Sequence, residues 1–124
     1  MLVACGAADG EGELAHGTPT VIDSAPANGE VDVDAELDEI TATFSTVMAT
    51  EGWSWVTELG HRAPVVTGLP FYVDGMTTVL PVRLEPDTEY AIWINSPDDR
   101  ELRKFTSADG VSARAHRIRF RTAP

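Results

Sequence analysis

Few residues of this chain have the types and spacing that catalysis requires. Its three histidines are far apart in the sequence. His16 lies in a glycine-rich stretch. His61 stands beside Arg62 in an expected loop, and His116 precedes the last expected strand. The G-x-S-x-G pattern of a nucleophilic serine is absent, and no histidine motif accompanies the single cysteine. Although groups distant in sequence can meet in a fold, we expect no enzymatic activity and no cofactor.

An acidic run is the candidate metal site. Five acids alternate with apolar residues from Glu30 to Asp38, so an extended backbone would place all five on one face. Calcium prefers oxygen ligands, but it also needs a loop that wraps around the ion. The EF-hand glycine is missing, because Leu37 stands at its position. We expect no metal and interpret residues 30–39 as a sheet edge whose charges discourage pairing with another chain. Calcium binding stays the open alternative.

The single cysteine, Cys5, is a candidate site of lipid attachment. One cysteine cannot form a disulfide within the chain, so its thiol is free. Leu2-Val3-Ala4 before it and Gly6-Ala7 after it fit the bacterial lipobox, whose cysteine is acylated and becomes the mature N-terminus. The charged and apolar regions of a signal peptide do not stand upstream, so either the start is trimmed or the match is accidental. We expect an acylated Cys5.

Aromatic and basic residues near the C-terminus form a candidate binding surface. Two-residue alternation over residues 90–94 turns the isoleucines inward and Trp93 outward. Over residues 117–121 the same alternation turns the arginines outward, which places Arg119 or Arg121 near Trp93. Exposed tryptophans bind sugars and form hot spots for proteins, so this face predicts an unknown glycan or protein partner.

Two further tryptophans are candidates for the same binding surface. Trp53 and Trp55 share one face by alternation, either in the core or near Trp93. The alternative for all three is structural: a buried tryptophan pair, and an arginine stacked over Trp93. We favour this interpretation, because single exposed aromatic residues need no functional explanation. The three tryptophans and two arginines remain the candidate set for partner binding.

Composition narrows the class of protein. A chain of 124 residues, 43% of them hydrophobic, suits one domain with one core. The net charge of −11 argues against nucleic acid, whose phosphates need a basic patch. Residues 1–61 hold twelve acids and no Lys or Arg, whereas residues 100–121 hold seven basic residues and two acids. Neighbouring strands could set these two parts beside each other.

The chain divides into a tether and a folded domain. Residues 6–17 contain four glycines and three acids with little to bury, so we expect residues 1–17 to be a signal-peptide remnant and a flexible, disordered acidic tether. Over residues 18–124, short apolar stretches alternate with turn signals, which predicts an all-β sandwich. Asp74-Gly75 predicts a tight hairpin with a positive φ. The seven expected strands are residues 21–22, 40–45, 53–56, 71–73, 77–84, 90–94 and 117–121.

Four motifs occur in an order that a known family shares. Residues 25–29 form a proline-rich entry and an Asn-Gly turn, and residues 40–48 read I-x-x-x-F-S-x-x-M. Residues 84–90 read L-x-P-x-T-x-Y, and the last motif, residues 118–122, reads I-R-F-R-T. From Pro19 to Thr122 the chain therefore resembles the bacterial immunoglobulin-like domains of the S-layer and surface-protein type. It departs from them at Asp109-Gly110, where an Asp-x-x-Gly-Asn turn is usual.

The resemblance implies an antiparallel, immunoglobulin-like β-sandwich of about seven strands. Tyr90 follows a turn at the start of a strand, which predicts a tyrosine corner. Asp109 and Gly110 are expected to be structural turn residues. We expect a non-enzymatic cell-envelope lipoprotein that carries a single module, touches the membrane only through its lipid, and acts as a spacer or interaction domain. The alternative is a carbohydrate- or protein-recognition module that binds through the Trp/Arg face.

Overall fold

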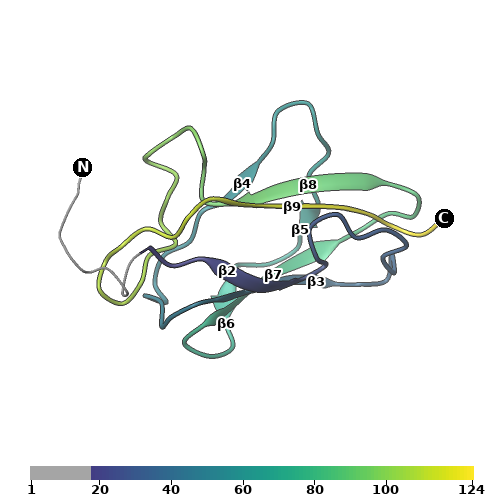
Figure 1. The fold of residues 1–124 in the computed structure, drawn as a ribbon. Helices are drawn as coiled ribbons and strands as arrows, with labels where there is room; N and C mark the ends of the chain where they lie inside the picture. Colours follow the sequence, from purple (N-terminus) through teal and green to yellow (C-terminus); the bar gives the residue numbers. More distant parts are fainter. Residues whose placement is uncertain (1–17) are drawn as a thin grey trace.

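The computed structural model describes residues 18–124, so Cys5 and the expected tether lie outside the described residues. The described part confirms the all-β prediction, because its strands form two antiparallel sheets and it contains no helix (Figure 1). No helix that could cross a membrane therefore occurs over residues 18–124. The strands are β2 (Val21–Ala25), β3 (Glu39–Phe44), β4 (Trp55–Thr57), β5 (Val65–Val66), β6 (Phe71–Tyr72), β7 (Thr77–Arg83), β8 (Glu89–Ile94) and β9 (His116–Arg121).

The two sheets divide the strands as in an immunoglobulin-like sandwich. The first sheet has the order β2-β3-β7-β5, and β6 also pairs with β7. The second has the order β4-β8-β9. Because β5 and β6 lie one after the other along the same side of β7, they act as one interrupted edge strand. Counted in this way, the sandwich has the expected seven strands, four in one sheet and three in the other.

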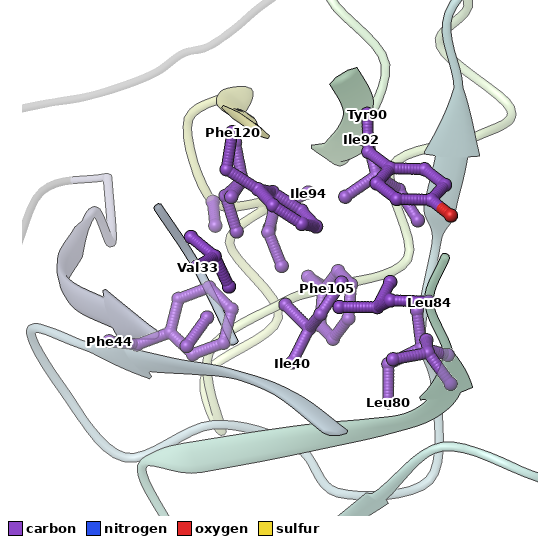
Figure 2. Close-up of a cluster of buried hydrophobic side chains, with 14 of the residues drawn as sticks. Val33, Ile40, Phe44, Leu80, Leu84, Tyr90, Ile92, Ile94, Phe105 and Phe120 are labelled. Carbon is purple, nitrogen blue, oxygen red and sulfur yellow. The ribbon is translucent and has the colours of Figure 1, made fainter. Parts of the chain in front are cut away.

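Two-residue alternation decides which face of each strand is buried. In β3, Ile40, Ala42 and Phe44 are fully buried, while the intervening threonines are half-buried. Strands β7 and β8 deliver Leu80 and Ile92 to the same interior. Each large apolar side chain among them contributes about 1.5–3 kcal/mol when it leaves water, so the matching of these faces is the main source of stability. Figure 2 shows Ile40, Phe44, Leu80 and Ile92 converging between the sheets.

Phe105 is a core residue that comes from a loop rather than a strand. Phe105 is fully buried, with its ring centroid 5.5 Å from that of Phe44. Its ring also meets Trp55 edge to face at 5.6 Å. Aromatic pairs of this geometry add roughly 0.5–1.5 kcal/mol to the burial of their surface. The loop between β8 and β9 is therefore part of the core and lies at one end of the sandwich (Figure 1).

A proline explains why the β5–β6 edge is interrupted. Pro81 lies inside β7, where Val82 donates its N–H to Asp38 on the β3 side. Adjacent residues of a strand face opposite neighbours, so the N–H that Pro81 lacks would have faced β5 and β6. Its carbonyl on that side still accepts a bond of 3.0 Å from Thr67. The ladder breaks beside the missing donor and resumes at β6.

The β6–β7 hairpin forms where the sequence predicts it, but with a different turn. Gly75 does not have a positive φ, and the loop closes through a 3.0 Å bond from the N–H of Val73 to the carbonyl of Thr77. One carboxylate oxygen of Asp74 accepts the N–H groups of Met76 and Thr77 at 2.7 and 2.8 Å. The prediction of a positive-φ turn is wrong, because the aspartate side chain satisfies the backbone donors instead.

The acidic run is not one extended strand with five acids on one face. Asp32 has a φ of 58°, and a turn follows in which Leu37 donates its N–H to the carbonyl of Asp34. Glu30 and Val33 bond along the edge of β9, where Val33 forms a parallel bridge to Thr122, and the run joins the first sheet only at Asp38 and Glu39. These acids are exposed, and residues 18–124 contain no group of three metal-binding side chains.

The two ends of the described chain lie at opposite ends of the sandwich. The carbonyl of Pro19 accepts a bond of 2.9 Å from the N–H of Arg114, just before β9 begins. Strand β9 then runs the length of the molecule before the chain ends at Pro124. Figure 1 shows this arrangement, with β2 beginning near one end and the C-terminus at the other.

Candidate functional site

The candidate surface is the outer face of the β4-β8-β9 sheet. Trp93 lies near the C-terminal end of β8, the central strand of this sheet, with Val56 of β4 opposite it on one side and Arg117 of β9 on the other. These side chains point away from the core, because their neighbours Ile92 and Ile94 along β8 point into it. Trp93 is half-buried on this face.

Glu58 fixes the tryptophan and the arginine in place. The turn after β4 carries Glu58 over the sheet, where its Oε1 accepts bonds of 2.8 Å from Trp93 Nε1 and from Arg117 Nε. Its Oε2 accepts a bond of 2.7 Å from Arg117 Nη2 and lies 2.9 Å from His61 Nδ1. Both carboxylate oxygens are therefore occupied, and the indole and guanidinium lose rotational freedom.

The charge state of Glu58 follows from these contacts. Removal from water would raise the pKa of its carboxyl group, but the hydrogen bonds from Arg117 and Trp93 and the charges of Arg117 and His61 outweigh that effect. The net result is a pKa below the usual 4.5. Glu58 is thus held as an anion at neutral pH and is not placed to take a proton from a ligand.

The other arginines of β9 lie further along the strand than expected. Arg119 is opposite Ala91 and Arg121 is opposite Glu89, so the arginine beside Trp93 is Arg117. Each has an acidic partner: Arg119 pairs with Glu89, and Arg121 Nη2 lies 2.9 Å from Asp87 Oδ1. This face therefore carries neutralised ion pairs rather than a positive patch.

A shallow depression adjoins Trp93. It has a volume of about 510 Å³ and lies between the turn after β4 and the loop after β8. Leu59 on its rim is 99% exposed, which leaves an apolar side chain available for contact. The lining residues are Val56, Thr57, Glu58, Leu59, Trp93, Ser96, Pro97, Asp98 and Arg117.

Trp53 and Trp55 lie away from this depression, at the open edge of β4. Trp55 is half-buried against the core, whereas Trp53 is 38% exposed. With Leu102 and Lys104 they line a second open groove of about 390 Å³. The structure therefore divides the three tryptophans between two places and does not join Trp53 and Trp55 to Trp93.

The residues expected to be structural lie in turns and corners. The Tyr90 hydroxyl is buried and accepts a bond of 2.8 Å from the N–H of Glu85, five residues upstream, which is tyrosine-corner geometry. Asp109 and Gly110 form the exposed tip of the loop between β8 and β9. Gly110 has a φ of 89° and donates its N–H to Ser107, so the turn requires a residue that tolerates positive φ.

Asn95 is a structural residue whose role sequence reasoning missed. It is fully buried with a φ of 60°. Its Nδ2 donates to the carbonyls of Phe105 and Ala113 at 3.0 and 2.9 Å, and its Oδ1 accepts the N–H of Phe105 at 3.0 Å. The available signal was an asparagine directly after an apolar strand, where a side chain can replace a missing backbone partner.

The two histidines of the described part, His61 and His116, lie apart. His61 contacts Glu58 on the outer face, whereas His116 is half-buried at the start of β9, where burial lowers its pKa below 6.5. His16 and Cys5 lie outside the described residues. Over residues 18–124, hydrogen bonds fix the indole of Trp93 and the guanidinium of Arg117 against the Glu58 carboxylate on the outer face.

Fold and surface together define an immunoglobulin-like module, which is a non-catalytic fold class. The family model described as a bacterial Ig-like domain matches residues 15–122, and the chain belongs to this family. This confirms the resemblance drawn from the sequence motifs. No match was found among curated proteins.

Solved structures share the fold. The N-terminal part of the bacterial S-layer protein SbsC matches 88% of this chain with a TM-score of 0.54 and 12% identity, over 24% of its own length. The S-layer protein rSbsC(31-844) matches 88% of this chain with a TM-score of 0.53 and 12% identity, over 14% of its length. This chain therefore spans a quarter or less of those proteins, and the likeness is one of fold.

Proposed function

We propose that this chain is an Ig-like module of a bacterial cell-envelope lipoprotein and acts without chemistry as a spacer or interaction domain. The observation that carries the proposal is the placement of Pro19 and Pro124 at opposite ends of one sandwich. A module built in this way separates whatever precedes it from whatever follows it. The family supports the envelope location, as does the fold shared with S-layer proteins.

The spacer function predicts one fixed end-to-end distance. Spin labels on Thr18→Cys and Pro124→Cys, in a Cys5→Ser background, report this distance by pulsed electron resonance. Ten residues separate Arg114 from Pro124, so the extended β9 region sets a distance of about 30 Å. A single narrow distribution supports a rigid spacer, whereas a broad or much shorter one contradicts it.

The lipid anchor is proposed from Cys5 and has its own test. Expression behind a bacterial signal sequence, with an alkyne-tagged fatty acid in the medium, should label the protein and direct it to membranes. Cys5→Ser should abolish labelling, because no other cysteine exists in the chain. Leu14→Ser, outside the lipobox, is the matched control and should label normally. Equal labelling of Cys5→Ser and the unchanged chain would exclude acylation at Cys5.

A second candidate function is recognition through the depression beside Trp93. The specific observation that favours it is the fixed Glu58–Arg117 pair beside a half-buried indole and the fully exposed Leu59. Sedimentation with peptidoglycan sacculi provides the test. Trp93→Ala should abolish co-sedimentation, whereas Trp53→Ala, outside the depression, should not.

The same variants separate binding from folding. If Trp93 binds a partner, Trp93→Ala should leave the thermal midpoint nearly unchanged. If Trp93 instead packs in the fold, the same change should lower the free energy of unfolding by about 3–5 kcal/mol through cavity formation. A loss of more than about 3 kcal/mol would reject partner binding through Trp93 and leave the spacer function standing.

A further inference from the structure

The N-terminal and C-terminal parts of the domain are joined side by side and in parallel. After β2 the chain leaves the first sheet and runs along the free edge of β9. There the N–H of Gly29 donates to the carbonyl of Arg119 at 2.5 Å, and the N–H of Arg119 donates to Asn28 Oδ1 at 3.0 Å. These are the first two of five bonds.

The remaining three bonds continue towards the C-terminus. The N–H of Arg121 donates to the carbonyl of Glu30 at 3.0 Å, and the N–H of Val33 donates to the carbonyl of Arg121 at 3.1 Å. The N–H of Ala123 then donates to the carbonyl of Val33 at 2.8 Å. We call residues 28–33 and 119–123, with these five bonds, the terminal clamp. The buried Val33 side chain anchors it to the core.

The direction of the two strands decides how tension acts on this clamp. Residues 28–33 run parallel to β9, and the ends of the described chain point out of opposite ends of the sandwich. Tension on the ends therefore pulls residue 28 and residue 123 in opposite directions along the strands. Bonds between strands lie roughly across the strand axis, so such tension shears all five at once. Peeling would instead break them one at a time.

The segment upstream of the clamp is held in the same manner. Strand β2 pairs with β3 from Val21 to Ala25, and Pro19 is bonded to Arg114. Tension on Thr18 therefore acts along β2 before it reaches the clamp. No long unpaired stretch lies between the start of the described chain and the clamp that could lengthen without loss of structure.

We propose that the domain is a tension-bearing element, with the terminal clamp as the part that resists extension. This goes beyond separation of neighbours: the module would hold its length when an attached envelope structure is pulled. The inference builds on the proposed spacer function, but its test uses the chain alone. A failed mechanical test would leave the envelope location and the lipid anchor untouched, and an unlabelled Cys5 would leave the clamp untouched.

Single-molecule pulling in two directions provides the test. In a Cys5→Ser background, handles on Thr18→Cys and Pro124→Cys load the clamp in shear. Handles on Thr18→Cys and Asp109→Cys pull on the loop end and do not load residues 119–123. Forced unfolding reports the barrier along the pulling direction. We expect a several-fold higher unfolding force for the first pair. Equal forces, or a higher force for the second pair, would overturn the proposal.

A matched pair of variants tests the clamp bonds themselves. Arg121→Pro removes the N–H that bonds Glu30, and proline is tolerated at a sheet edge. Arg121→Ala keeps that N–H and equally removes the guanidinium that pairs with Asp87. With end handles, Arg121→Pro should unfold at a lower force than Arg121→Ala, and equal forces would overturn the role of the clamp. If Arg121→Pro does not fold, the two pulling directions decide the question without it.

Discussion

At the scale of single residues, the two tyrosines of the chain differ in whether their buried hydroxyl groups have a hydrogen-bond partner. Tyr90 is buried with its hydroxyl bonded to the N–H of Glu85. Tyr72 is packed against the core, but its buried hydroxyl has no partner among residues 18–124. Burial raises the pKa of Tyr72 to about 12, because the charged form cannot be solvated there.

The two hydroxyls should therefore respond differently to removal. Tyr90→Phe leaves the Glu85 N–H unpaired and should lower the free energy of unfolding by about 1–2 kcal/mol. Tyr72→Phe removes an unpaired polar atom and should leave the stability unchanged or raise it. Urea denaturation of the two variants measures both effects. An unchanged midpoint for Tyr90→Phe would contradict the tyrosine corner.

Glu58 makes stability depend on acidity. Its pKa is lowered in the folded state, so the unfolded chain takes up the proton first as the pH falls below 4.5. The stabilisation is fully present at neutral pH and is lost as the pH falls through the folded-state pKa. Glu58→Gln should destabilise the protein at pH 7 and flatten the acid limb of the stability profile. Glu51→Gln, at an exposed acid outside the ion pairs described above, should keep that limb, and a matching loss there would refute the assignment.

Asn95 acts at the scale of elements, because it joins a strand to a loop. Its three hydrogen bonds hold the β8–β9 loop against the end of β8, which brings Phe105 into the core. Asn95→Ala leaves the carbonyl of Ala113 and the N–H of Phe105 without a partner, because the Phe105 carbonyl still accepts the N–H of Ala113. The two unpaired groups should cost about 2–4 kcal/mol in total. Asn28→Ala, which removes one exposed bond, should cost about 1 kcal/mol or less. Chemical denaturation compares them, and similar losses would show that the loop does not depend on Asn95.

Some features of the strands and turns could be predicted from the sequence, and others could not. Alternation predicted the buried faces of β3, β8 and β9, because side chains in a strand point to opposite faces whatever surrounds them. The predicted type of the β6–β7 turn was wrong, because the Asp74 carboxylate accepts the backbone N–H groups of the turn. The interruption between β5 and β6, opposite Pro81, could not be predicted from the sequence. It depends on which neighbouring strand the missing N–H of Pro81 would face.

At the scale of the whole molecule, the acidic and basic parts of the chain come together. Glu58 pairs with Arg117, and the acidic segment around Glu30 lies along β9 with its arginines. The uneven charge along the sequence is therefore partly internal to the fold. The remaining negative charge keeps the surface repulsive to anionic partners.

The division into residues 1–17 and 18–124 leads to a further prediction. The core cluster and the five clamp bonds are made by residues from Thr18 onward. A chain that starts at Thr18 should therefore unfold within about 0.5 kcal/mol of the full chain. Thermal and urea denaturation of both forms measure this. A larger loss of stability would show that residues 1–17 belong to the folded domain.

The sequence alone determined the class of fold, because strand periodicity, turn residues and motif order are local properties of the chain. It also identified Tyr90, since a tyrosine that follows a turn can bond the backbone just upstream. The partner of Trp93 was decided by the tertiary structure: the register of β8 against β9 places Arg117 there, two residues before Arg119. The terminal clamp likewise joins segments about ninety residues apart, and only the folded chain brings them together.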